Sequence, residues 1–112
     1  MKKIEAIIRP FKLYEVKEAL NGAGVMAMTV SEVQGSGATP GPTDTYRGLE
    51  YRVDLRPRVK VEVVVEDCRA DQVSWIITKA ARTGSPGAGV IFVSSLEDSI
   101  RIRTGERGET AV

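Results

Sequence analysis

The order of strand-like and helix-like segments predicts an α+β domain with one antiparallel sheet. Three observations support this: each half of the chain reads as strand, helix, strand; β-branched residues dominate the strand-like runs; and a stretch rich in Gly and Pro separates the halves. Two such units fold most simply as a ferredoxin-like split βαβ sandwich, with both helices on one face of the sheet. The length of 112 residues predicts a single domain over 1–112.

The first unit begins the chain. Ile4–Ile8 is a short, largely apolar run that ends at Arg9, so we expect a buried strand. Pro10 suits the first turn of a helix, where its missing N–H is not needed, and apolar residues then recur at helical spacing over 11–23. Residues 25–33 contain several β-branched side chains and predict the second strand.

A long excursion follows over 35–57. Residues 35–48 contain four Gly and two Pro, a density that predicts a loop without a regular element. Loops longer than about 12 to 15 residues are uncommon in compact domains and tend to be functional or disordered. This segment is therefore the first place to look for function.

The second unit repeats the pattern. Residues 59–65 alternate apolar and charged side chains before becoming wholly apolar, which predicts a half-buried strand. Asp67 can cap the following helix, whose apolar stripe runs over 70–81. The Gly-rich segment 83–89 then breaks the chain.

The last part of the chain predicts two more strands. Residues 90–93 are apolar and predict the fourth strand. Ile100–Thr104 alternates apolar and charged residues and predicts a short fifth strand. We therefore expect 101–112 to form a C-terminal strand and tail.

The composition excludes several classes of protein. The chain contains 0 His and 1 Cys, and its 16 Lys+Arg against 15 Asp+Glu give a net charge of +1. Without His, the chain has no base for a Ser-His-Asp or Cys-His enzyme and no ligands for a His-Cys zinc site. A net charge this small argues against a nucleic-acid partner. We expect a binding protein, without metal, rather than an enzyme.

The same composition predicts a cytoplasmic location. A single thiol cannot form an internal disulfide, as expected for a reducing compartment. Charged residues interrupt the first ten positions, and no apolar run approaches the roughly 20 residues that cross a membrane.

Two glycine runs flank expected strands. Gly35-Ser36-Gly37 follows one strand and Gly87-Ala88-Gly89 precedes another, so their backbone N–H groups could cradle phosphate. Arg101 and Arg103 alternate along one segment, and arginine binds phosphate oxygens bidentately. The alternatives stay open: glycines at strand ends usually serve tight turns, and alternating charges also protect a solvated edge strand.

Several segments together resemble the PII nitrogen-regulatory signal proteins over almost the whole chain. The segments that carry the resemblance are 1–13 (MKKIEAIIRPFKL), 28–33 (MTVSEV), 47–51 (RGLEY), 79–84 (KAARTG), 91–93 (IFV) and 101–109 (RIRTGERGE). The resemblance implies a homotrimer with three adenine-nucleotide clefts between neighbouring subunits. Each cleft would be bordered by the base of the long excursion, which is called the T-loop in this family.

The resemblance also assigns residues to the cleft. It implies that the two glycine runs wrap the phosphates, that two arginines arrive from the adjacent subunit, and that three positions hold the adenosine part. These are Gly35, Ser36, Gly37, Gly87, Ala88 and Gly89 for the phosphates, Arg101 and Arg103 from the neighbour, and Thr29, Glu62 and Val64 for the adenosine.

Two residues of the long excursion match the tip of the family's T-loop. There the residue equivalent to Arg47 can plug the pore of a membrane transporter, and the one equivalent to Tyr51 can be uridylylated in some bacteria. Aromatics and Arg are also favoured as interface anchors, although both residues could instead pack locally. The resemblance thus implies a regulated protein partner, with an ammonium-class transporter as a candidate that would recruit the protein to the membrane.

This chain departs from the family at both phosphate loops. After Gly37 the family has Arg-Gln-Lys-Gly, where this chain has Ala-Thr-Pro-Gly over 38–41. The second loop normally reads Gly-Asp-Gly-Lys, and here Val90 replaces the Lys. Arg58 stands where a Lys usually meets the carboxylate of 2-oxoglutarate. Because a charge-assisted hydrogen bond is worth roughly 1.5–3 kcal/mol, two lost cations predict weaker nucleotide binding, most of all for ATP.

We therefore expect a PII-like sensor that favours ADP or AMP over Mg-ATP with 2-oxoglutarate and regulates a partner through its long loop. The alternative is a PII-like protein that senses another small anion, or that acts by loop-mediated binding alone. An acylphosphatase-like enzyme fits poorly, because Arg9 is followed at once by Pro10 and not by a Gly-rich cradle. An RNA-binding module of this topology would carry stacking aromatics on its central strands, and 4–8 and 59–65 contain none.

Overall fold

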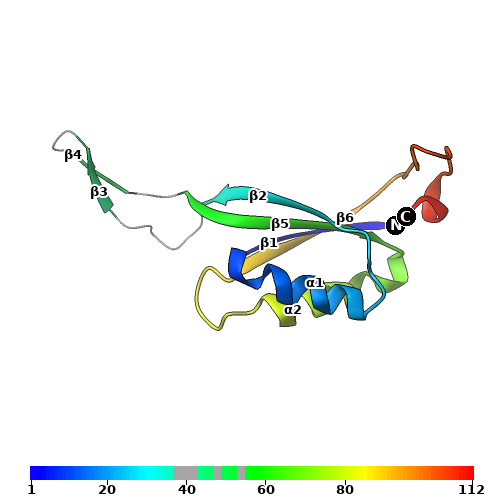
Figure 1. The fold of residues 1–112 in the computed structure, drawn as a ribbon, viewed down its shortest axis with the longest axis horizontal. Coiled ribbons are helices and arrows are strands. Elements are labelled where there is room, and N and C mark those ends of the chain that lie inside the picture. Colours follow the sequence, from blue (N-terminus) through cyan, green and yellow to red (C-terminus); the bar gives the residue numbers. More distant parts are fainter. Residues whose placement is uncertain (37–42, 47–48, 53–54) are drawn as a thin grey trace.

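The computed structural model describes residues 1–36, 43–46, 49–52 and 55–112, with side chains over 1–36 and 55–112. Its main sheet has four antiparallel strands in the order β2-β5-β1-β6. Their bounds are Lys2–Ile8 for β1, Thr29–Gly35 for β2, Arg56–Val65 for β5 and Gly89–Ser95 for β6. Helices α1 (Leu13–Gly22) and α2 (Ala70–Ala81) cover one face of the sheet (Figure 1). This confirms the predicted ferredoxin-like sandwich.

Alternation along the central strands builds the core. Every second side chain of β1 and β5 is buried under the helices, and the helices together with Val25 contribute the other half of the cluster. Apolar side chains that alternate along a strand in this way share one face of the sheet. The largest of the fully buried side chains are Ile4, Ile8, Val16, Leu20, Val61, Val63, Val73 and Ile77.

Both helices begin with a 3-10 turn. Pro10 opens the turn η1 (Pro10–Lys12) before α1, as its fixed φ predicts. The turn η2 (Asp67–Arg69) precedes α2, but the predicted cap by Asp67 is wrong. Its carboxylate instead pairs with the N-terminal ammonium of Met1, with 2.8 Å between N and Oδ1. A full positive charge held close to the carboxylate competes well with a backbone N–H.

The largest differences from the predicted strand boundaries are at the starts of β2 and β5, while β1 and β6 extend one or two residues beyond the predicted 4–8 and 90–93. The second strand begins at Thr29 rather than at residue 25, and Val25 packs into the core before the strand starts. Strand β5 begins at Arg56, three residues earlier than expected, because β2 pairs with it as far as Gly35 opposite Arg56. Sheet pairing, which local composition does not report, sets these ends.

The long excursion contains a second, two-stranded antiparallel sheet. It joins β3 (Thr43–Tyr46) to β4 (Leu49–Arg52), so the expectation of a loop without regular elements is wrong. Within residues 35–48 the glycines and prolines lie before residue 43 and at position 48, whereas the strands contain Thr, Tyr and Leu. Those side chains favour the extended conformation.

The predicted fifth strand over 100–104 is also wrong. Ile100 forms one isolated bridge with Arg107, and the residues after Arg101 make a turn. The N–H of Gly105 donates to the carbonyl of Arg101 at 2.7 Å, and Gly105 has a positive φ of 76° that suits glycine. A short 3-10 turn, η3 (Gly108–Ala111), follows. Alternating residue types were not enough here, because a strand also needs a pairing partner and the described part of the chain gives this segment only the single bridge to Arg107.

Among the helices of the described residues, none is both long and apolar enough to cross a lipid bilayer.

Candidate functional site

The two glycine runs meet at one arginine. A Cβ on Gly35, at the end of β2, would lie 3.4 Å from Cγ of Arg58. A Cβ on Gly87 would lie 3.8 Å from Nη2 of Arg58 and 3.0 Å from Nη2 of Arg9. The structure therefore brings the two predicted phosphate runs to the same end of the sheet, with Arg58 between them. In the first run Gly35 and Ser36 belong to the described residues, and Gly37 lies outside them.

Glycine is required in the second run. Gly87 has a φ of 84° and Gly89 a φ of 135°, both in the range that other residues avoid. A Cβ on Gly89 would also collide with the carbonyl oxygen of Ile7. The run is thus held against the end of β1, and Ala88, between the two glycines, lines a small hollow beside β6.

Three arginines gather at this end. Nη2 of Arg9 donates to the carbonyl oxygen of Pro86 at 3.0 Å, and Nη1 of Arg58 donates to that of Pro57 at 2.7 Å. Burial, followed by repulsion from Arg9 and then Arg56, lowers the pKa of Arg58. Nε of Arg9 is buried and has no hydrogen-bond partner among the described residues. These guanidinium groups form an electropositive cluster that suits an anion.

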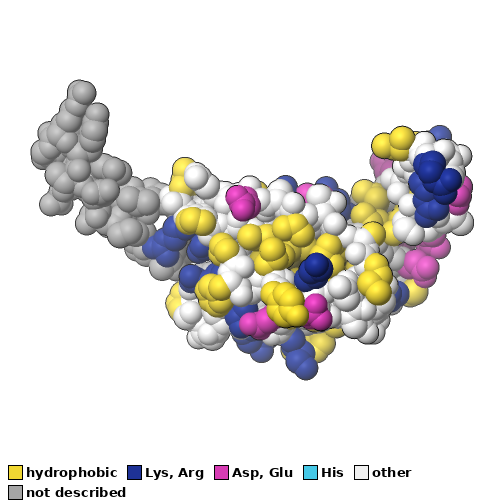
Figure 2. Space-filling view, in the orientation of Figure 1, with side chains coloured by type: hydrophobic (Ala, Val, Ile, Leu, Met, Phe, Trp, Pro, Cys, Tyr) yellow, Lys and Arg dark blue, Asp and Glu magenta, His cyan; other side chains and the backbone are white. Residues whose placement is uncertain are grey.

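The cluster is larger than the sequence predicted. Arg58 was expected at an effector site, but Arg9 and Arg56 were not assigned to it. Strands β1 and β5 pair with Ile8 opposite Val59, and continuing that register by one residue places Arg9 opposite Arg58. The strand register is therefore the signal that could have found Arg9. Figure 2 shows Lys and Arg side chains gathered at the end of the main sheet where β2 ends and β5 begins.

A hollow of about 500 Å³ lies beside the cluster. Pro10, Glu32, Gln34, Arg58 and Val59 are among the residues of η1, β2 and β5 that line or border it. Its size suits a small organic anion, and Arg58 supplies a positive charge at its wall.

The three residues predicted for the adenosine part lie together on the same two strands. Thr29 of β2 and Glu62 of β5 are direct partners in the sheet, and Val64 lies two residues further along the same face of β5. This face is the one opposite the helices, and we call it the open face. Thr29 stands six residues before Gly35 on β2, so one pair of strands carries both predicted ends of the cleft.

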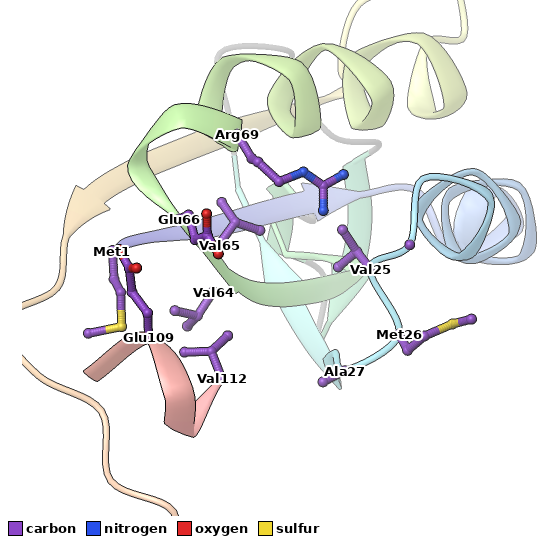
Figure 3. A pocket seen from close by; sticks show the side chains of 11 residues that line it. Met1, Val25, Met26, Ala27, Val64, Val65, Glu66, Arg69, Glu109 and Val112 are labelled. Carbon is purple, nitrogen blue, oxygen red and sulfur yellow. The ribbon is translucent and has the colours of Figure 1, made fainter. Parts of the chain in front are cut away.

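A second hollow, of about 310 Å³, adjoins the end of the strands where the adenosine part is predicted to bind (Figure 3). Val64, Met26 and Arg69 line it, and Val112 approaches Val64 from the C-terminal turn. Nη2 of Arg69 donates to the carbonyl oxygen of Ala23 at 2.6 Å, which fixes this side chain at the wall. The C-terminal segment of the same chain thus borders the adenosine end.

Arg101 and Arg103 lie far from the glycine runs. The C-terminal segment is at the end of the sheet where both termini lie, and the glycine runs are at the opposite end (Figure 1). Arg101 donates to the carbonyl oxygen of Thr110 at 3.2 Å and pairs with Glu106 at 3.7 Å. A single chain therefore does not bring these arginines to its own glycine runs.

The two residues predicted to contact a partner, Arg47 and Tyr51, belong to the long excursion. Arg47 lies outside the described residues, and Tyr51 belongs to β4, where it pairs with Asp44 through the backbone. The described residues contain no group of three or more His, Cys, Asp and Glu side chains that could hold a metal ion.

Comparison with known proteins identifies the family of the chain. Residues 1–106 match the family model described as nitrogen regulatory protein P-II. The chain is 57% identical over 112 residues to the nitrogen regulatory protein P-II of Nostoc punctiforme, and 57% identical to that of Rhizobium meliloti. It is 54% identical to the protein of the same name from Rhodospirillum rubrum, and in all three cases each chain is covered completely. The fold, the motifs and these similarities lead to one conclusion: the chain belongs to the P-II family of nitrogen regulatory proteins.

Proposed function

We propose that this P-II family regulator is a homotrimeric sensor that binds ADP or AMP in preference to Mg-ATP with 2-oxoglutarate. The observation that carries the proposal is the convergence of Gly35 and Gly87 on Arg58. Backbone N–H groups beside a guanidinium group form a phosphate site that needs no metal. Gly37 and Ser36 would extend this cradle, and Ala88 and Gly89 would extend its other side.

The second subunit completes the site in this proposal. Arg101 and Arg103 cannot reach the glycine runs of their own chain, so in the trimer they would serve a neighbouring cleft. Arg103 makes no hydrogen bond or ion pair with any of the described residues, which leaves it available for a phosphate. Light scattering coupled to gel filtration is expected to give three times the 12.2 kDa mass of one chain.

The preference for fewer phosphates follows from the missing cation at position 90. Val90 is 47% exposed at the start of β6, next to Gly89, and it offers no charge there. The substitution Val90→Lys should restore a phosphate contact and raise ATP affinity by about 10- to 100-fold, because a charge-assisted hydrogen bond contributes about 1.5–3 kcal/mol.

Isothermal titration calorimetry checks this proposal. The wild-type protein is titrated with ADP, AMP and Mg-ATP, the last with and without 2-oxoglutarate. Val90→Met serves as the matched control, since it adds length without charge. Tight, 2-oxoglutarate-dependent binding of Mg-ATP to the wild-type protein would refute the proposed preference.

The arginine cluster favours a second candidate function, in which the effector is a different small anion. Arg9 and Arg58 face no carboxylate at ion-pair distance among the described residues, and the neighbouring hollow can take a small organic acid. A thermal-shift screen of small carboxylates and inorganic anions separates the two candidates, because a true ligand stabilises the folded state by mass action.

The output of the sensor would be the conformation of the segment 35–57. Ligand at its base would change how this segment presents Arg47 and Tyr51 to a regulated protein, with a membrane transporter as the first candidate. This would recruit an otherwise cytoplasmic protein to the membrane. Deleting residues 42–53 should abolish capture of the partner in a pull-down, and capture that survives the deletion would refute a loop-mediated contact.

A further inference from the structure

Four charged side chains form a network on the open face of the sheet. Lys3 and Glu5 come from β1, and Lys60 and Glu62 come from β5. Nζ of Lys3 lies 2.9 Å from Oε1 of Glu5 and 3.6 Å from Oε2 of Glu62. Nζ of Lys60 lies 3.3 Å from Oε1 of Glu62. All four side chains are only about one-third exposed.

The network contains a pair that a sheet normally avoids. Glu5 and Glu62 are direct cross-strand partners, and like charges in that position destabilise a sheet. Lys3 offsets the repulsion by pairing with both carboxylates, and its pKa is raised by the hydrogen bond and charge of Glu5 and by the charge of Glu62. Lys60 adds a second positive charge beside Glu62. The lysines thus offset the repulsion between the two neighbouring carboxylates.

The two carboxylates are not held alike. Glu5 has the short contact with Lys3, and this bond lowers the pKa of Glu5. Glu62 is held from both of its oxygens at longer distances, by Lys60 on one and Lys3 on the other. A carboxylate has about four acceptor positions, so Glu62 is fixed in place while keeping capacity for a further donor. Its other cross-strand neighbour is Thr29, at the adenosine end of the proposed cleft.

We propose that Lys3 and Lys60 are positioning residues, which fix the carboxylate of Glu62 as a hydrogen-bond acceptor for the nucleoside part of the bound nucleotide. The inference rests on the proposed nucleotide binding. An ionised carboxylate only accepts hydrogen bonds, so its partner must be a donor, and adenosine offers the amino group of the base and the hydroxyls of the ribose. A site built around such a bond discriminates against an analogue that lacks the donor.

Calorimetry with three nucleotides tests the inference. The wild-type protein is titrated with ADP, with 2′-deoxy-ADP, which lacks one ribose hydroxyl, and with IDP, which lacks the amino group. The selectivity ratio is the larger of the two analogue Kd values divided by the Kd for ADP. We expect a wild-type ratio of about 10 or more, the value of one charge-assisted hydrogen bond.

The variants Lys60→Met and Lys3→Met should each lower this ratio by about threefold or more, because Glu62 then loses one of the two contacts that orient it. The ratio of ADP to AMP affinity should stay unchanged, since it reports the phosphate end. Lys12→Met is the matched control: it removes the same charge and also breaks an ion pair, to Glu15 at 3.2 Å. Lys60→Arg should retain the wild-type selectivity ratio.

A merely structural role predicts a different result. Removing a structural ion pair would lower the melting temperature and weaken all three nucleotides alike. In the Glu62→Gln background, Lys60→Met should cause no further loss of selectivity. Lys3→Gln and Lys60→Gln provide a second pair of variants should either Met variant fail to fold.

The possible contradictions are distinct. Unchanged selectivity in both lysine variants, or a wild-type ratio near one, would overturn the inference while leaving nucleotide binding intact. A wild-type protein that binds none of the three nucleotides would overturn the proposed function and this inference with it.

Discussion

The two arginine-rich ends of the molecule differ in what faces the guanidinium groups. At the glycine-run end, Arg9 and Arg58 donate to backbone carbonyls and lie close enough to repel each other. At the C-terminal end, Arg107 pairs with Asp98 at 2.7 Å and Arg101 pairs with Glu106. Among the described residues, Arg9 and Arg58 have no carboxylate at ion-pair distance, whereas Arg101 and Arg107 at the other end each have one and Arg103 does not. Unpaired guanidinium groups beside glycine backbone suit an anion, whereas the pair between Arg107 and Asp98 holds the C-terminal turn together.

Glycine substitutions at the two ends give the largest expected contrast. Gly89→Ala should lower the free energy of unfolding by about 2–4 kcal/mol, because it adds a collision with the Ile7 carbonyl to an unfavourable φ. Gly105 also has a positive φ, of 76°, but there is open space around the methyl group that Gly105→Ala would add. This substitution should therefore lower the free energy of unfolding by only about 1 kcal/mol. Urea denaturation measures both, and equal losses would show that Gly89 is not closely packed.

Arginine substitutions should separate binding from stability. Arg58→Met is expected to weaken ADP binding by about 10- to 100-fold without lowering the melting temperature, because it removes the proposed phosphate contact and relieves repulsion between arginines. Arg107→Met should lower the melting temperature and leave ADP binding unchanged, since it breaks the ion pair with Asp98 and leaves the glycine runs untouched. Calorimetry and thermal melts on the two variants check this, and a large loss of stability in Arg58→Met would contradict it.

The C-terminal end should also respond to acid. The hydrogen bond from Arg107, with help from the Ser99 N–H, holds the pKa of Asp98 below its ordinary value of 3.8. A lowered folded-state pKa means that the stabilisation is complete above the unfolded-state pKa and disappears as pH falls through the folded-state value. The stability gap between the wild type and Asp98→Asn should therefore be constant near neutral pH and close below about pH 4. A gap that persists in strong acid would exclude the ion pair as its cause.

Salt should produce the smallest difference. Screening weakens repulsion among Arg9, Arg56 and Arg58, so about 0.5 M NaCl should narrow any stability gain of Arg58→Met over the wild type. The same salt should reduce the loss caused by Arg107→Met, because exposed ion pairs weaken as well. Melting temperatures at low and high salt measure both changes. Each change in the free energy of unfolding should stay under about 1 kcal/mol.

Prediction from the sequence succeeded where local pattern decides the structure. The valines of 59–65 alternate as a half-buried strand must, and Pro10 marks the start of the first helical segment. Prediction failed where pairing partners decide. Ile100–Thr104 alternates equally well but forms only one isolated bridge within the described residues, while β3 and β4 pair inside a segment that was expected to be a loop.

The candidate site was predictable in the same uneven way. The two glycine runs and Arg58 could be named from motifs and the family resemblance, and the structure places Gly35 and Gly87 beside that arginine. Arg9 was missed, because its role depends on the register between β1 and β5, which a single strand does not contain.

The sequence by itself determined the family, the buried faces of the strands and helices, and the loss of the cation at position 90, because each is carried by residue types at fixed spacing. Only the tertiary structure decided that Arg9, Arg56 and Arg58 share one end and that Arg101 and Arg103 occupy the other. It also placed Glu62 between Glu5 and Thr29 with a lysine at each oxygen. The physical reason is that charge clusters form across strands, so their members are set by sheet register and not by distance along the chain.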